Sequence, residues 1–234
     1  VPLSVLLKEC GVQKGGTWLV SESDDAGRYT YTLPMAKAMD DVMVVYGQNG
    51  EPLRPDQGYP VRLLVPGWEG PYSVKWLRQI KVVDQPYLAW DEAMGHSIAR
   101  PDLGNKARWH HFEMPVKSLV TRPSGGQTLP GKGFYEISGI AWSGAGLVRR
   151  VEVTTDGGKT WKDAKLQGPV HRKAYTRFTL PWTWDGGEAM ITSRATDEKG
   201  EVQPSIKELS KNWGIDSEDS WEHAEHAFHF NATQ

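Results

Sequence analysis

The segment from Asn49 to Trp76 combines basic side chains with many Pro and Gly residues. Arg62 lies within a run typical of a β-strand, and Ser73 and Lys75 follow a Gly- and Pro-rich loop. Backbone N–H groups in such loops, with guanidinium and ammonium groups nearby, bind phosphate and other polyanions. The alternative is that Arg62 and Lys75 are charges on half-exposed strands, and spacing alone favours that alternative.

The sequence TTDGGKTW at residues 154–161 matches an Asp-box, in which the Asp side chain stabilises a β-turn and the Trp packs beneath it. Asp156 is then expected to bond nearby backbone N–H groups. Asp-boxes recur across the blades of sialidase propellers, but a propeller needs several blades and this chain has one copy. We therefore predict a structural hairpin turn. A carbohydrate-binding or sialidase-like β-protein is the weaker alternative.

The C-terminal tail contains His223, His226 and His229 at intervals of three residues. Neutral imidazole is a good ligand for zinc or copper. A regular helix would spread these three side chains over a broad arc, and the spacing matches no established metal motif. We predict no metal site here.

Cys10 is the sole cysteine, so no intrachain disulfide is possible and the cysteine count does not identify a redox compartment. It lies in an apolar, helix-like run with no base beside it. A small buried thiol is therefore favoured over a nucleophile or a metal ligand.

The composition excludes several classes of protein. The chain has 234 residues, a formal net charge of −2 and a pI of about 6.4, which argue against a nucleic-acid-binding protein. No apolar stretch reaches the eighteen residues of a membrane span. The chain begins at Val1 with residues that look like the inside of a domain and no signal peptide precedes them, so we infer a fragment or a processed chain.

The first half mixes predicted helices and strands. Leu3, Leu6 and Leu7 recur at helical spacing, between Pro2 as a helix start and Gly11 as a stop. Predicted helices cover residues 3–10 and 34–39, and predicted strands cover residues 17–20, 29–32, 42–46, 59–65 and 74–83. Residues 84–111 give few signals and are predicted to be mostly loop.

The second half reads as an antiparallel β-sandwich. Predicted strands cover residues 117–121, 134–142, 147–154, 176–180 and 189–196, with Gly-rich turns between them. We place the boundary near residue 113. The fold class expected is thus α+β over residues 1–112, followed by a sandwich over residues 113–234.

Residues 45–82 resemble the signature of the molybdenum domain of the sulfite oxidase family, because NGEPL, GYPVR, VPG and SVKWL occur in the family's order and spacing. Residues 1–13 and 33–40 are similar to its neighbouring segments, and residues 133–166 are similar to its immunoglobulin-like dimerisation domain. Residues 117–127, 182–187 and 193–204 look most like the sulfane dehydrogenase branch and its bacterial sulfite dehydrogenase relatives. The resemblance covers nearly the whole chain and accounts for a single Asp-box.

The resemblance implies a site for molybdopterin, the molybdenum cofactor. Arg62, Ser73 and Lys75 match positions that hold the pterin and its phosphate, and Gln57 stands where vertebrate-type members have a pterin-binding His. His96 falls where the family has an active-site Tyr, and it is the candidate catalytic residue, as a hydrogen-bond donor or a proton acceptor. An exposed loop His is the alternative.

Two further positions bear on activity. Trp213 stands where sulfite-binding members carry an Arg, which argues against free sulfite as substrate. The family's molybdenum-ligating cysteine lies upstream of Val1, so this chain alone lacks that ligand, and Cys10 does not replace it.

The resemblance also implies a function and partners. The intact protein is expected to be a periplasmic enzyme that oxidises sulfane sulfur on a carrier protein and passes electrons to a c-type cytochrome. A homodimer through the C-terminal domain is expected, and a second chain with the missing upstream half is possible. Sulfite dehydrogenase is the alternative activity, and a non-catalytic assembly module with a vestigial cofactor half is the alternative class.

Overall fold

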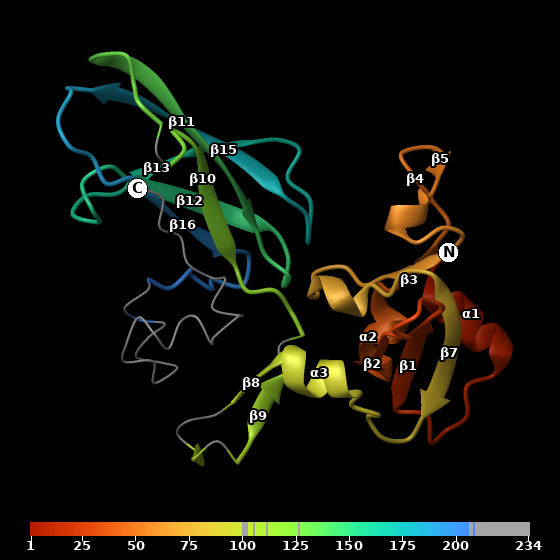
Figure 1. Ribbon diagram of the computed structural model, residues 1–234. Helices are drawn as coiled ribbons and strands as arrows, with labels where there is room; N and C mark the ends of the chain where they lie inside the picture. The colour runs from red at the N-terminus through yellow and green to blue at the C-terminus, as the bar shows by residue number, and fades with distance from the viewer. Residues whose placement is uncertain (100–102, 105, 111, 126, 206–207, 209–234) are drawn as a thin grey trace. The chain divides into compact units, whose positions relative to one another are not determined.

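The computed structural model describes residues 1–99, 103–104, 106–110, 112–125, 127–205 and 208 (Figure 1). The chain forms two compact units. The first comprises residues 1–99 and 106–112, and the second comprises residues 100–105 and 113–234. No helix in the described part is long and apolar enough to cross a bilayer.

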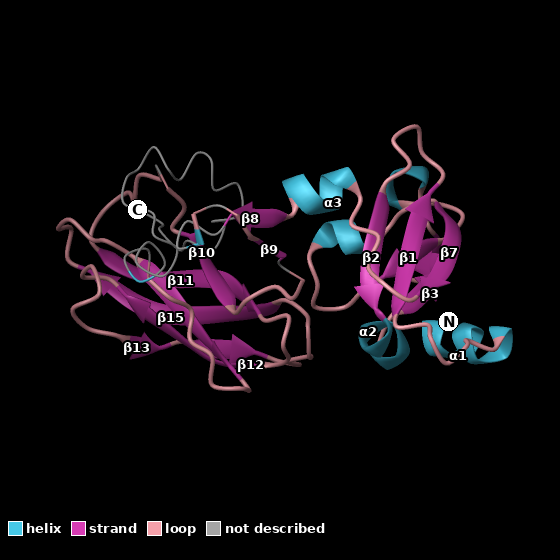
Figure 2. Ribbon diagram, turned by 90° about the horizontal axis from the view of Figure 1, so that it is seen from below, coloured by secondary structure: helices cyan, strands magenta, loops and turns pink. Residues whose placement is uncertain are grey.

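The first unit is built on a three-stranded antiparallel sheet of order β2-β1-β7. Strand β1 is Trp18–Ser23, β2 is Thr30–Pro34 and β7 is Leu77–Val83. Helices α1 (Leu3–Cys10) and α2 (Met35–Asp40) lie beside this sheet (Figure 2).

The predicted N-terminal helix is confirmed with the expected bounds. Leu3 and Leu7 lie on one face of α1, and both are buried in the core of the unit. Gly11 ends the helix in the left-handed conformation, with φ of 70°. The helix is therefore stabilised by one buried stripe and by a glycine cap.

Four short strands and two 3₁₀ helices carry the segment singled out for its basic residues. Strand β3 (Met43–Val45) pairs with β6 (Arg62–Leu64), and β4 (Gly47–Gln48) pairs with β5 (Glu51–Pro52) across the Asn49-Gly50 turn. The 3₁₀ helix η1 is Pro55–Gln57, and η2 is Gly70–Tyr72. Strand β6, η2 and the loop after η2 contribute residues to the lining of a pocket in the first unit.

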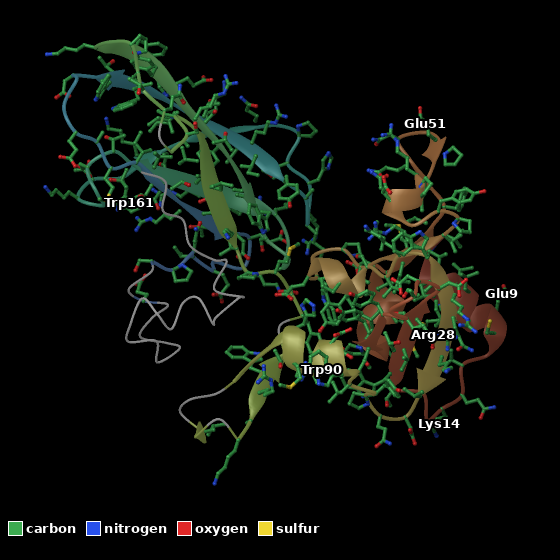
Figure 3. The ribbon with its side chains drawn as sticks, in the orientation of Figure 1. Glu9, Lys14, Arg28, Glu51, Trp90 and Trp161 are labelled. Atoms are coloured by element: carbon green, nitrogen blue, oxygen red, sulfur yellow. The ribbon has the colours of Figure 1, made fainter. Side chains whose placement is uncertain are left out.

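The prediction of mostly loop over residues 84–111 is wrong for the described part of that range. Helix α3 (Trp90–Gly95) lies there, and strands β8 (Ser97–Ala99) and β9 (Arg108–His110) pair. Helix α3 has no apolar periodicity, since Trp90 points outward and is 76% exposed (Figure 3). Its one fully buried side chain is Glu92. Because a buried carboxylate and not an apolar stripe holds this helix, the sequence shows no hydrophobic periodicity from which the helix could be predicted.

The second unit is an immunoglobulin-like β-sandwich of antiparallel strands. One sheet has the order β10-β11-β15-β14 and the other has the order β13-β12-β16. The strands are β10 (Lys117–Arg122), β11 (Gly133–Trp142), β12 (Val148–Thr154), β13 (Lys162–Asp163), β14 (Lys165–Gln167), β15 (Thr176–Trp184) and β16 (Thr192–Asp197). Both sheets contribute to the core, as Ile137 and Phe178 from one and Val151 and Ala195 from the other are fully buried.

The Asp-box forms a single turn in this second unit. The Asp156 carboxylate accepts hydrogen bonds from the backbone N–H (2.9 Å) and hydroxyl (2.6 Å) of Thr160 and from the Thr154 hydroxyl (2.7 Å). These bonds lower the pKa of Asp156 well below its ordinary value. The indole N–H of Trp161 donates to the Gly158 carbonyl at 3.2 Å (Figure 3). The motif thus stabilises a turn, as its structural interpretation predicts.

Candidate functional site

A pocket of about 360 Å³ lies within the first unit. It is bounded by residues at the ends of β1 and β2, by β6, by η2 and the loop after it, and by the residue that ends α3. Four of the five site residues predicted from the sequence line this pocket: Arg62, Ser73, Lys75 and His96. The fold therefore brings together side chains that are up to 34 positions apart.

Arg62 ties the walls of the pocket together. Its Nη1 donates to the carbonyl of Gln57 at 3.1 Å, and its Nη2 donates to the carbonyl of Ser73 at 2.7 Å. Its Nε donates to the Leu63 carbonyl at 3.3 Å. Burial lowers the pKa of Arg62, but a guanidinium keeps its proton in proteins. A half-buried cation therefore lies in the pocket, with three of its five N–H groups used by these backbone bonds.

Ser73 and Lys75 lie on the segment that leads into β7. The Ser73 hydroxyl accepts a hydrogen bond from the backbone N–H of Val65 at 3.0 Å, which links this segment to the end of β6. The Lys75 ammonium donates to the Asp56 carbonyl at 2.7 Å and lies 5.6 Å from the centroid of the Trp76 ring. Its remaining N–H groups give the pocket a second cation with donors to spare.

Gly58 allows the loop after η1 to approach this segment. It has φ of 102°, a conformation that residues with side chains rarely adopt. A Cβ atom at this position would lie 2.9 Å from the Lys75 Cβ and 3.0 Å from its Cα. A glycine is thus required where the loop carrying Gln57 packs against Lys75.

Gln57 differs from the other four predicted residues. Its backbone carbonyl accepts from Arg62, but its side chain is not part of the pocket lining. The structure therefore gives Gln57 a place in the wall through its main chain. Its assignment as a pterin ligand stays a prediction.

His96 lies at the pocket wall, at the C-terminal end of α3. Its Nδ1 is 3.8 Å from the Oε2 atom of Glu69, and its ring centroid is 5.6 Å from that of Tyr31 in an edge-to-face arrangement. The side chain is 24% exposed, so the alternative of a solvent-exposed loop His does not describe its surroundings. Tyr31, Glu69 and Glu92 around it carried no sequence signal, because they meet only through the tertiary fold.

Glu92 is a fully buried carboxylate near His96. It accepts hydrogen bonds from the Thr32 backbone N–H at 3.1 Å and from the Thr32 hydroxyl at 2.9 Å. Burial raises the pKa of Glu92, and the bonds from Thr32 oppose that rise.

This raised pKa predicts a pH dependence of stability. The folded protein keeps the Glu92 proton to a higher pH than the unfolded chain, whose Glu pKa is about 4.3. The contribution is therefore fully present below that unfolded pKa and is lost as pH rises through the folded pKa. We expect the free energy of unfolding of the wild type, relative to E92Q, to fall with rising pH in denaturant titrations. If the difference in free energy of unfolding between the wild type and E92Q stays constant as pH rises from about 4.3, the assignment of a raised Glu92 pKa is contradicted.

Other residues considered from the sequence lie outside this pocket. Cys10 is exposed and lies on α1 beside a separate apolar cavity, so the expectation that it is buried is wrong. Trp213, His223, His226 and His229 lie outside the described residues. Among the residues that the structure describes, no group of three or more His, Cys, Asp or Glu side chains is arranged to hold a metal ion.

Both units are similar to domains of known protein families. Residues 1–90 match the oxidoreductase molybdopterin binding domain, and residues 108–221 match the Mo-co oxidoreductase dimerisation domain. The crystal structure of the sulfane dehydrogenase SoxCD from Paracoccus pantotrophus is similar, with a TM-score of 0.86 and 45% identity over 90% of this chain and 54% of that chain.

Curated relatives of known activity are similar in sequence. Human mitochondrial sulfite oxidase is 36% identical over 199 residues, which is 78% of this chain and 36% of that protein. The NADH nitrate reductase of Solanum lycopersicum is 35% identical over 243 aligned residues, which is 87% of this chain and 26% of that protein. The chain thus spans about a quarter to a third of the length of these relatives. Its two domains, their order and the similarity along both show that the chain belongs to the sulfite oxidase family of molybdopterin-binding oxidoreductases.

Proposed function

We propose that this chain is the C-terminal half of a molybdenum-cofactor oxidoreductase that oxidises a sulfur compound. The observation that carries the proposal is the convergence of Arg62, Ser73, Lys75 and His96 on one pocket. We assign residues 1–112 to the molybdopterin-binding domain and residues 113–234 to the dimerisation domain.

The side chains of the pocket suit an anionic arm of molybdopterin. Arg62 and Lys75 are two cations in the pocket lining, and each keeps N–H groups beyond those bonded to backbone carbonyls. Phosphate groups are commonly bound by guanidinium and ammonium groups. A guanidinium can donate to two phosphate oxygens at once, and an ammonium acts as a point charge. Asp25 is an opposing charge in the lining, and the two cations outnumber it. The donor set therefore fits a phosphate-bearing cofactor.

The roles of the protein residues follow from these positions. Arg62 and Lys75 would hold the phosphate, while Ser73 holds the wall by its bond to Val65. His96 would donate a hydrogen bond or accept a proton at the pocket. When bound, the molybdenum cofactor supplies oxygen-atom transfer and two-electron redox chemistry, and the protein supplies binding and orientation.

We propose sulfane sulfur on a carrier protein as the substrate and a c-type cytochrome as the electron acceptor, in the periplasm. The support is the 45% identity to a structure named sulfane dehydrogenase. Free sulfite is the second candidate, because human sulfite oxidase is 36% identical. The Trp213 argument against sulfite falls outside the described residues.

We propose a homodimer assembled through the second unit, because that unit matches a dimerisation domain. A second chain carrying the upstream half of the cofactor domain, with its cysteine ligand, is a further proposed partner. A non-catalytic assembly module is the alternative class. The cations retained in the pocket argue against it, since Arg62 and Lys75 keep N–H groups beyond those bonded to backbone carbonyls, and an anion would use them.

The test is metal and pterin analysis of the purified protein, followed by steady-state assays. We expect near-stoichiometric molybdenum and pterin, and faster cytochrome c reduction with a protein-bound persulfide than with sulfite. Faster turnover of sulfite would select the sulfite dehydrogenase alternative. Absence of both molybdenum and pterin from preparations that include the upstream half with its cysteine would support the assembly module and refute an enzyme.

A further inference from the structure

We propose that Glu69 and Glu92 are positioning residues for His96, Glu92 by fixing helix α3 and Glu69 by the negative charge that it places beside one nitrogen of the imidazole ring. The inference rests on the proposed function in one respect, namely that His96 acts at the pocket. The contacts that place the ring all lie within the first unit.

Helix α3 needs an anchor from outside itself. It has six residues and no side-chain cap at its N-terminus, and helices this short are not stable alone. The Glu92 carboxylate provides the anchor, since both of its oxygens accept bonds from Thr32 on β2. Glu92 is fully buried, so water cannot replace those bonds.

The anchor sets where His96 lies. His96 follows Glu92 by four residues, one helical turn, and it ends the same helix. Tyr31 precedes Thr32 on β2, and its ring meets the His96 ring edge-to-face at 5.6 Å. Strand β2 thus holds the helix through Thr32 and contacts the imidazole through Tyr31.

Glu69 lies beside one nitrogen of the ring. Its Oε2 atom lies 3.8 Å from His96 Nδ1, and the side chain is 17% exposed. Its backbone is rigid, because its N–H donates to the Phe112 carbonyl at 3.0 Å and its carbonyl accepts from the Tyr72 N–H at 3.2 Å. The adjacent Trp68 stacks on Phe112 at 4.8 Å. The main chain that carries Glu69 is therefore anchored where its carboxylate lies beside Nδ1.

The Oε2–Nδ1 separation of 3.8 Å is too long for a hydrogen bond, but the negative charge of the carboxylate favours the ring proton on Nδ1 by electrostatic attraction. In the neutral ring Nε2 is then the basic nitrogen. Glu69 would in this way select the tautomer, and Glu92 with Tyr31 would set the place of the ring. Neither glutamate lines the pocket, so both act through His96.

The first test is the tautomer of His96, read from long-range ¹H–¹⁵N spectra of the histidine-labelled chain at a pH well above the ordinary imidazole pKa of about 6.5. We expect the Nδ1–H form to predominate in the wild type. In E69A, which removes the negative charge beside Nδ1, its ratio to the Nε2–H form should fall about twofold or more. E69Q keeps an acceptor and should retain part of the preference. E113A, at an exposed glutamate of the second unit, is the control and should leave His96 unchanged.

The second test separates placement from general stability. T32S keeps the hydroxyl donor to Glu92 and T32V removes it, while both keep the backbone bond. We expect nuclear Overhauser contacts between the Tyr31 and His96 rings in the wild type and T32S, and their weakening in T32V at temperatures where all three are folded. An unchanged tautomer ratio in folded E69A, or unchanged ring contacts in folded T32V, would overturn the assignment of the glutamate concerned.

Failure of the proposed function gives a different result. A protein without molybdenum that still shows these spectral changes would refute the enzyme and keep the positioning roles. In the cofactor-loaded protein, E69A should lower kcat about tenfold with little change in KM, and E69Q should restore part of that loss.

Discussion

Replacing Arg62 with lysine should weaken retention of the molybdenum cofactor about tenfold to a hundredfold. Lysine keeps the charge, but its ammonium cannot bond the Gln57 and Ser73 carbonyls and also present two parallel donors to a phosphate. Hydrogen bonds to charged groups contribute about 1.5–3 kcal/mol, and about 1.4 kcal/mol corresponds to a tenfold change in affinity. The measurement is molybdenum and pterin content per chain after extensive dialysis.

R78K is the matched control. Arg78 lies on β7, is 45% exposed, faces Glu22 and Asp24 at 3.7 Å and 3.8 Å, and is not among the residues that line the pocket. It should keep the cofactor content of the wild type. An R62K protein that is folded by circular dichroism and retains a full complement of cofactor would show that Arg62 does not hold the phosphate.

Gly58→Ala should destabilise the first unit by about 2–5 kcal/mol, because it adds steric overlap to backbone strain. The new Cβ would lie 2.9–3.1 Å from Lys75 and from the Trp76 backbone nitrogen, and φ is 102°. Relief requires the loop after η1 to move away from Lys75. That movement would also break the bond from Lys75 to the Asp56 carbonyl and displace one cation of the pocket.

Gly50→Ala separates the two causes. Gly50 also has positive φ, of 81°, but nothing lies within 4 Å of a Cβ atom there. It should lose only about 1–2 kcal/mol from the left-handed backbone and should keep its cofactor. The measurement is the free energy of unfolding from denaturant titration, together with cofactor content. Equal losses in the two variants would mean that contact with Lys75 is unimportant.

Local signals in the sequence were sufficient for much of the fold. The spacing of Leu3 and Leu7 predicted α1 because its burial is a single stripe along one helix face. The strands of the second unit were predicted within a few residues because they are long and turns separate them, although β15 continues to Trp184, beyond the predicted end at residue 180. The two short strands β13 and β14 were missed, since two or three residues carry no readable alternation.

The candidate site was only partly predictable. Arg62, Ser73 and Lys75 lie in one continuous motif, so resemblance located them without knowledge of the fold. Spacing alone favoured exposed charges for Arg62 and Lys75. Lys75 is indeed exposed, whereas Arg62 is half-buried and bonded to two other segments of the pocket wall. Glu69 and Glu92 could not be identified, because their role depends on distances to His96 and Thr32 that only the tertiary fold sets.

The central claim is that the pocket of Arg62, Ser73, Lys75 and His96 holds the phosphate-bearing cofactor of the family. A crystal structure of the cofactor-loaded protein tests it most directly. We predict the cofactor phosphate within hydrogen-bond distance, about 3 Å, of both the Arg62 guanidinium and the Lys75 ammonium. A bound cofactor whose phosphate contacts neither side chain would contradict the account.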